Sequence, residues 1–171
     1  MHRQTPWLGL LCWLLALGCR ADPAEALRLT EHRPSAFSIQ LLDADTSSQG
    51  SAAEGVLTVK SQPVTQMLWW SRPKRSPREQ AEHERKLLVA AGSDAETFAM
   101  DEELQESRQQ GHLALNWSTA IDKTRFRSTL IDCGHHQLLL TTMGPGQELI
   151  AGLHVRSLKS LSCDPAARPG E

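Results

Sequence analysis

The chain has 171 residues, with 18 Lys or Arg against 20 Asp or Glu, and 40 % of its residues are hydrophobic. This apolar content excludes a disordered composition, and the length corresponds to about one domain. The acidic excess disfavours nucleic-acid binding, which needs clustered lysine and arginine against phosphate.

The N-terminal 21 residues predict a cleavable secretory signal. A short basic start at Met1–Arg3 precedes an apolar run over 6–18, and small residues follow at Cys19 and Ala21. The apolar run is shorter than the roughly 20 residues that a membrane-spanning helix needs. We therefore expect a secreted chain that begins at Asp22, with no membrane span after signal removal.

The region 22–71 is predicted to be made of strands. Phe37, Ile39 and Leu41 alternate with polar residues, which is the pattern of a half-buried strand. The expected strands are 36–42, 55–60 and 64–70, with a loop over 43–54. Trp69 and Trp70 are adjacent, so we expect them on opposite faces of the last strand.

The basic segment 72–77 is predicted to be a linker or exposed loop. Ser76 and Glu79 form a capping box around Pro77, which predicts a helix that ends before Gly92. A second capping box, Ser93 to Glu96, predicts another helix as far as about Gln110.

The remaining residues predict further strands. Within 78–162, the strands expected after the two helices are 112–118, 124–132, 136–142 and 148–158, and residues 163–171 are expected to form a flexible tail. The resulting order predicts an α+β fold with one or two helices packed on an antiparallel sheet. A β-sandwich with a helical excursion is the alternative.

Two cysteines remain after signal removal, Cys133 and Cys163. An even pair in an oxidising compartment predicts a disulfide, and two unpaired thiols are the alternative.

The segment Arg72-Pro73-Lys74-Arg75 resembles the recognition sequence of furin-type proprotein convertases. Such proteases recognise several substrate cations at once through acidic subsites, so the spacing of Arg72, Lys74 and Arg75 carries the resemblance. The resemblance implies cleavage between Arg75 and Ser76. The alternative is an ordinary basic surface loop.

Asn116-Trp117-Ser118 is an acceptor sequence for N-glycosylation. The strand predicted here places Trp117 inward with Leu113 and Leu115, so Asn116 is expected to face outward.

The sequence predicts no metal site, cofactor site or catalytic residue. Cys133 precedes His135 and His136, but a disulfide would take the cysteine away from any metal. No nucleophile elbow, glycine-rich phosphate loop or metalloprotease motif occurs.

These features predict a secreted, non-enzymatic glycoprotein of signalling or binding type, with an unidentified protein partner or receptor. Processing after Arg75 is part of this prediction. The alternatives are a luminal accessory or chaperone-like protein, and a secreted protease inhibitor or enzyme.

Overall fold

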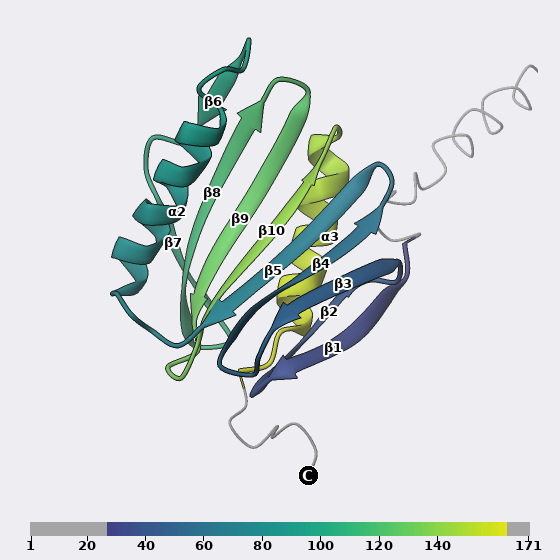
Figure 1. The fold of residues 1–171 in the computed structure, drawn as a ribbon, viewed down its shortest axis with the longest axis vertical. Coiled ribbons are helices and arrows are strands. Elements are labelled where there is room, and N and C mark those ends of the chain that lie inside the picture. Colours follow the sequence, from purple (N-terminus) through teal and green to yellow (C-terminus); the bar gives the residue numbers. More distant parts are fainter. Residues whose placement is uncertain (1–26, 164–171) are drawn as a thin grey trace, which may run out of the picture.

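The computed structural model describes residues 27–163 (Figure 1). The predicted signal with its cleavage site at Ala21 and Asp22, and the predicted tail after Cys163, lie outside these residues. The strands are β1 (Leu29–Ser35), β2 (Phe37–Leu42), β3 (Asp45–Gly50), β4 (Glu54–Ser61), β5 (Val64–Ser71), β6 (Phe98–Met100), β7 (Gln105–Gln109), β8 (His112–Ile121), β9 (Thr124–Asp132) and β10 (Gln137–Gly144), and the helices are α2 (Pro77–Ala91) and α3 (Gln147–Ser160).

An eight-stranded antiparallel sheet forms the centre of the molecule. Its strand order is β3-β4-β5-β10-β9-β8-β6, and β7 pairs with another part of β8. The strands β1 and β2 form a separate hairpin. The predicted α+β fold with helices packed on an antiparallel sheet is therefore confirmed.

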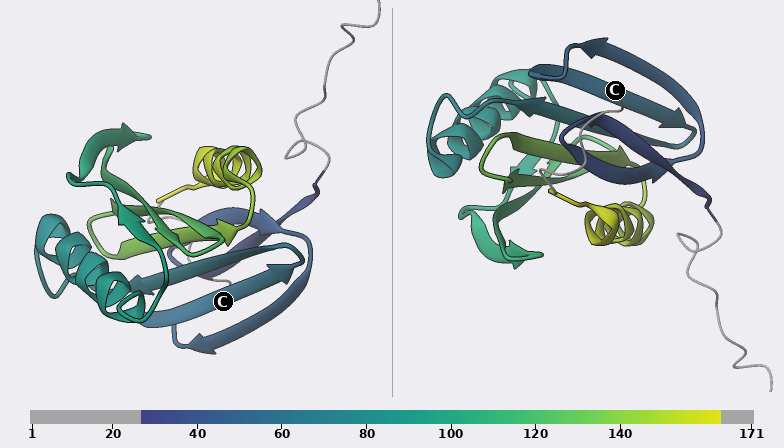
Figure 2. Two further views of the ribbon diagram at one scale, coloured as in Figure 1. Left: turned by 90° about the horizontal axis from the view of Figure 1, so that it is seen from above. Right: turned by 90° about the horizontal axis from the view of Figure 1, so that it is seen from below.

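The two faces of the sheet are covered differently (Figure 2). The helix α3 and the β1–β2 hairpin cover one face, where Phe37, Leu68, Trp70 and Leu153 belong to the larger hydrophobic core. The helix α2 covers the opposite face over β8 and β9 with a smaller core around Trp117. Within residues 27–163, neither helix has the length and apolar character to cross a membrane.

The adjacent tryptophans of β5 point to opposite faces of the sheet, as the alternation of side chains along a strand predicts. Trp70 is 2 % exposed in the larger core, and its ring meets Phe37 edge to face. Trp69 is half-buried on the α2 side.

The regions before and after the basic segment form one sheet. Strand β5 pairs with β10 over seven residue pairs, from Ser71 with Gln137 to Thr65 with Met143. The end of the described chain also joins the β1–β2 hairpin, because Ser38 and Ser162 exchange backbone hydrogen bonds of 3.0 and 2.8 Å.

Several predicted elements are wrong in type. Residues 93–110, predicted helical, form β6, β7 and turns, because their backbone pairs with β8. Residues 148–158, predicted to be a strand, lie within α3. The predicted loop 43–54 contains β3, and the sequence patterns also missed β1.

Candidate functional site

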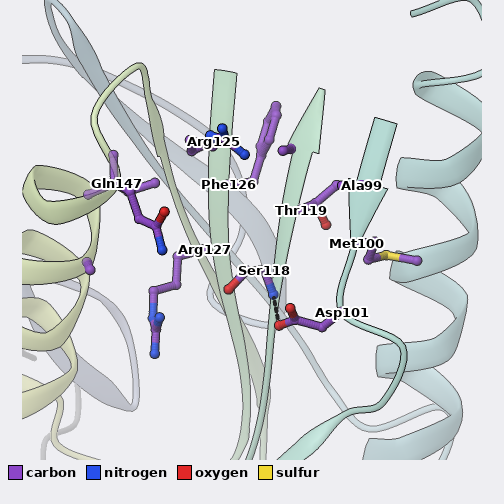
Figure 3. Close-up of a pocket in the computed structure, with 12 residues that line it drawn as sticks. Ala99, Met100, Asp101, Ser118, Thr119, Arg125, Phe126, Arg127 and Gln147 are labelled. Carbon is purple, nitrogen blue, oxygen red and sulfur yellow. Dashed lines mark hydrogen bonds between the residues drawn. The ribbon is translucent and has the colours of Figure 1, made fainter. Parts of the chain in front are cut away.

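A trough of about 270 Å³ lies on the α3 face of the sheet, at the end of β8 and the start of β9, where α3 begins. The sheet forms its floor, the start of α3 forms one wall, and β6 with Asp101 forms the other (Figure 3). The lining residues are Ala99, Met100, Asp101, Ser118, Thr119, Ala120, Arg125, Phe126, Arg127, Gln147, Ile150 and Ala151.

Two arginines of β9 supply the positive charge of this trough. Arg125 and Arg127 are two residues apart in a strand, so both side chains leave the same face of the sheet. Arg125 is exposed and Arg127 is half-buried. Among residues 27–163, neither guanidinium has a hydrogen-bond or ion-pair partner. Both guanidinium groups are therefore free to bind an external anion.

Neutral polar groups lie beside the arginines. Gln147 is the first residue of α3, and its amide points toward Arg127, as does the hydroxyl of Ser118 (Figure 3). Gly146, the N-cap of α3, provides no side-chain hydrogen bond, so the first backbone N–H groups of the helix lack a side-chain cap. Donors of this kind favour an anion near a helix N-terminus.

One carboxylate and several apolar side chains complete the lining. Asp101 accepts a 2.7 Å hydrogen bond from the backbone N–H of Ser118, which fixes the carboxylate at the wall opposite α3. Met100, Phe126 and Ile150 are the largest apolar side chains of the lining. The trough thus offers two guanidinium groups, one opposing carboxylate and an apolar surface for the remainder of a ligand.

A buried hydrogen-bond network lies under α3 beside the trough. His154 is fully buried, with Nε2 2.8 Å from Thr129 Oγ and Nδ1 3.0 Å from Thr142 Oγ. The Thr129 hydroxyl donates to Asn116 Oδ1, so it accepts from His154, and the imidazole proton is on Nε2. Burial, with a smaller effect of the Arg127 charge, lowers the pKa of His154 to about 3.

The network continues across the sheet through Gln66. Its Nε2 donates to Ser157 Oγ at 2.9 Å and to Thr142 Oγ at 3.4 Å, and its Oε1 accepts from the backbone N–H of Leu42 at 2.8 Å. These bonds connect α3 with strands of the sheet and with the β1–β2 hairpin. The network satisfies buried polar groups that would otherwise destabilise this face.

The two cysteines predicted to pair are joined by a disulfide, with Cα atoms 5.3 Å apart. Cys133 follows β9, and Cys163 follows α3. The bond links the end of the α3 segment to the β9–β10 turn, away from the trough lining.

The convertase-like segment is exposed, but its backbone is held at the predicted scissile bond. The carbonyl of Arg75 accepts a 2.9 Å hydrogen bond from Gln137 Nε2, and the N–H of Ser76 donates to Glu79 at 3.0 Å. Ser76 is also the N-cap of α2 in a complete capping box. Hydrogen bonding with Ser76 lowers the pKa of Glu79 and favours the carboxylate that closes this box.

Asn116 lies on β8 on the face opposite the buried Trp117, and its side chain is half-buried. Its Nδ2 donates to Gln105 O at 3.0 Å and to Ser107 Oγ at 2.9 Å, while Oδ1 accepts from Thr129. A glycan on Nδ2 would replace a proton that this arrangement uses.

The histidines after Cys133 belong to a turn. His135 is exposed, and His136 is buried with Nε2 3.1 Å from Ala52 O. Burial lowers the pKa of His136 and favours its neutral form. Within the described part of the chain, no three His, Cys, Asp or Glu side chains converge as a metal site would require.

Sequence reasoning identified the strand that carries Arg125 and Arg127 but did not single out the arginines. Their alternate spacing was a usable signal, because it places two cations on one face of a predicted strand. Ser118 and Gln147 join them only through the folding of distant segments.

No family model matches the sequence, and no curated protein matches it. Among solved structures, the chain is similar to cyanobacterial PsbP from Synechocystis, with a TM-score of 0.56 and 9 % identity over 86 % of this chain and 98 % of that chain. It is also similar to a Pseudomonas aeruginosa protein of unknown function, with a TM-score of 0.45 and 15 % identity over 84 % of this chain and 99 % of that chain. The likeness to PsbP is one of fold.

Proposed function

We propose that the protein is an exported, non-enzymatic binding protein that holds an anionic group of its ligand in the trough beside α3. The observation that carries this proposal is the pair of guanidinium groups, Arg125 and Arg127, without partners inside the described chain. Guanidinium groups bind carboxylates and phosphates through two parallel hydrogen bonds. Gln147 and Ser118 add neutral donors at the same place.

Exposure and burial support different roles for the two arginines. Arg127 is half-buried between the sheet and α3, where a reduced dielectric strengthens its attraction for an anion. Arg125 is exposed at the mouth, where its contribution is screened by salt. We therefore expect Arg127 to contribute more to affinity and Arg125 more to the rate of association.

The test is a titration of the folded protein with succinate and with inorganic phosphate, using neutral succinamide for comparison. We expect the anions to bind and succinamide not to bind. Arg127→Ala should weaken anion binding roughly tenfold or more, because a charge-assisted bidentate contact is lost. Lys60→Ala removes an exposed charge outside the trough and serves as the matched control. Equal affinity of wild type and an Arg125→Ala/Arg127→Ala variant would contradict the proposal.

Export is supported by the N-terminal pattern and is compatible with the disulfide, since disulfides persist in oxidising compartments. Intact-mass analysis of the secreted product tests this part of the proposal. We expect a chain beginning at Asp22, with a linked cysteine pair. A product that retains Met1 would contradict export by a cleaved signal.

Processing after Arg75 and glycosylation at Asn116 remain part of the proposal, and both are read from the same mass spectrum. Cleavage needs the capping box at Ser76 to open, because both sides of the scissile bond are hydrogen bonded. The two products would stay together through the pairing of β5 with β10. An intact chain in convertase-competent cells would contradict processing after Arg75.

A further inference from the structure

The sheet face opposite the trough is covered by a helix over only part of its width. There α2 packs over β8 and β9, and β4 and β5 have no helix over this side (Figure 1). Val56, Met67 and Trp69 point to this side, because Val56 pairs with Trp69 and Met67 lies two residues before it. All three side chains are half-buried.

A groove of about 590 Å³ lies between these strands and α2. We call it the α2 groove: Val56, Met67, Trp69 and Leu139 form its floor, and His83 and Leu87 belong to its α2 wall. Leu87 is 53 % exposed, although it is a large apolar residue. Exposed apolar surface of this kind marks interaction sites, and tryptophan and methionine are common at protein-binding surfaces.

The charges at the groove favour an acidic occupant. Lys74 and Arg75 belong to its lining at the N-terminal end of α2. Lys74 forms an exposed ion pair with Glu54, which contributes little in water, and Arg75 has no ion-pair partner among residues 27–163. Glu84, the acidic residue of the lining, already accepts a hydrogen bond from Gln80. A carboxylate of a partner would therefore meet Arg75 directly, and it could take the place of Glu54 in the exposed ion pair with Lys74.

We propose that the α2 groove binds a partner protein through a peptide segment that carries large apolar side chains next to acidic residues. The apolar side chains lie over Met67 and Trp69, and the carboxylates contact Lys74 and Arg75. The proposal gives the basic segment a role as part of a docking site, whether or not it is cut. It does not rest on the anion trough, which lies on the other face of the sheet.

The test is selection of a random peptide library on the folded protein, followed by affinity measurement for the enriched peptides. We expect enriched sequences that combine aromatic or large aliphatic residues with neighbouring Asp or Glu. Hydrogen exchange should show added protection in β5 and α2 when such a peptide binds.

Two variants on the exposed side of α2 provide a matched comparison. Leu87→Glu places a carboxylate in the groove and should weaken the enriched peptides roughly tenfold. Val89→Glu makes the same chemical change at a residue that is 45 % exposed outside the groove lining, and should leave affinity unchanged. Lys74→Glu/Arg75→Glu should also weaken these peptides and shift selection toward basic sequences.

Three outcomes would overturn the proposal. The first is an absence of enrichment, and the second is equal affinity for wild type and Leu87→Glu. The third is recovery of wild type on anionic lipid vesicles together with no acidic peptide binding, which would identify a membrane surface as the occupant.

Discussion

The two helices are attached to the sheet in different ways. Helix α3 buries Ile150, Leu153, His154 and Leu158 against both the sheet and the β1–β2 hairpin. Helix α2 buries only Gln80, Ala81 and Arg85. Its additional anchor is Arg85, whose guanidinium donates to the backbone carbonyls of Asp101 and Glu102.

Because of this difference, we expect the α3 face to be the more stable one and the α2 face to be the more accessible to a partner. Apolar packing, a hydrogen-bond network and a disulfide all hold the α3 segment, so this face resists local opening. The α2 face has a smaller core and leaves part of the sheet open to a partner. Segments with few buried contacts are those that open with the least free energy. We therefore expect α2 to exchange its amide hydrogens faster than α3.

The largest expected effect tests the packing of the two helices directly. Leu153→Ala should lower the free energy of unfolding by about 4 kcal/mol, because Leu153 is fully buried and its loss leaves a cavity. Leu88→Ala on α2 should cost about 1–2 kcal/mol, because Leu88 is only partly buried. Urea denaturation measures both values. Equal losses of unfolding free energy in the two variants would show that α2 and α3 are packed equally tightly.

The disulfide should contribute slightly less than the buried leucine. The residues Cys133 and Cys163 are 30 positions apart, and the chain-entropy relation gives about 3.7 kcal/mol for a loop of this length. Cys133→Ser/Cys163→Ser should lower the urea midpoint accordingly. Hydrogen exchange should then rise at α3 and the β1–β2 hairpin before it rises at α2. Faster hydrogen exchange confined to α2 would contradict the view that the disulfide stabilises the α3 face.

Acid should destabilise the folded protein through the buried His154. The unfolded chain has a histidine pKa near 6.5, and folding lowers that of His154 to about 3. Between these pH values the unfolded state binds a proton that the folded state excludes, so acid favours unfolding. This one group should lower the free energy of unfolding by about 2 kcal/mol from pH 7 to pH 5.

His154→Gln provides the control for this prediction. Glutamine keeps one donor and one acceptor for Thr129 and Thr142 but does not titrate. The free energy of unfolding of this variant should therefore depend less on pH between 7 and 5. An unchanged dependence would show that other groups cause the acid sensitivity.

The smallest effect is expected at the start of α2. Ser76→Ala removes the N-cap and should cost about 1 kcal/mol. Ser93→Ala, at an exposed turn residue after the helix, should change stability by less than about 0.5 kcal/mol. The Ser76→Ala variant should also be cut faster by a basic-specific protease at Arg75. A cutting rate equal to that of wild type would show that the cap does not protect this bond.

Short sequence patterns predicted the elements that are determined by residues close together in the sequence. The capping box at Ser76 and the glycine at position 92 gave the bounds of α2, and alternation gave β9. The same capping signal at Ser93 was misleading, because pairing of residues 98–109 with β8 outweighs a local cap. Local propensity is a weak prior where a sheet edge competes for the same backbone.

The error at α3 has a different cause. Its buried positions Ile150, Leu153, His154, Ser157 and Leu158 follow a helical period. Two of these positions are polar, which weakens the apolar stripe of the helix. Their burial depends on Gln66, Thr129 and Thr142 in distant strands. The trough could not be predicted from the sequence either, because its walls come from β6 and α3, which are far apart along the chain.

The pairing of distant segments also determines when the chain can fold. Ser71 of β5 pairs with Gln137 of β10, and Ser38 of β2 exchanges hydrogen bonds with Ser162. Neither pairing can form until the C-terminal partner has been synthesised. Contacts between residues far apart in sequence form slowly. Hairpins of consecutive strands, such as β4–β5 and β8–β9, can form earlier, but they stay two separate parts of the sheet until β10 has been made and pairs with both β5 and β9.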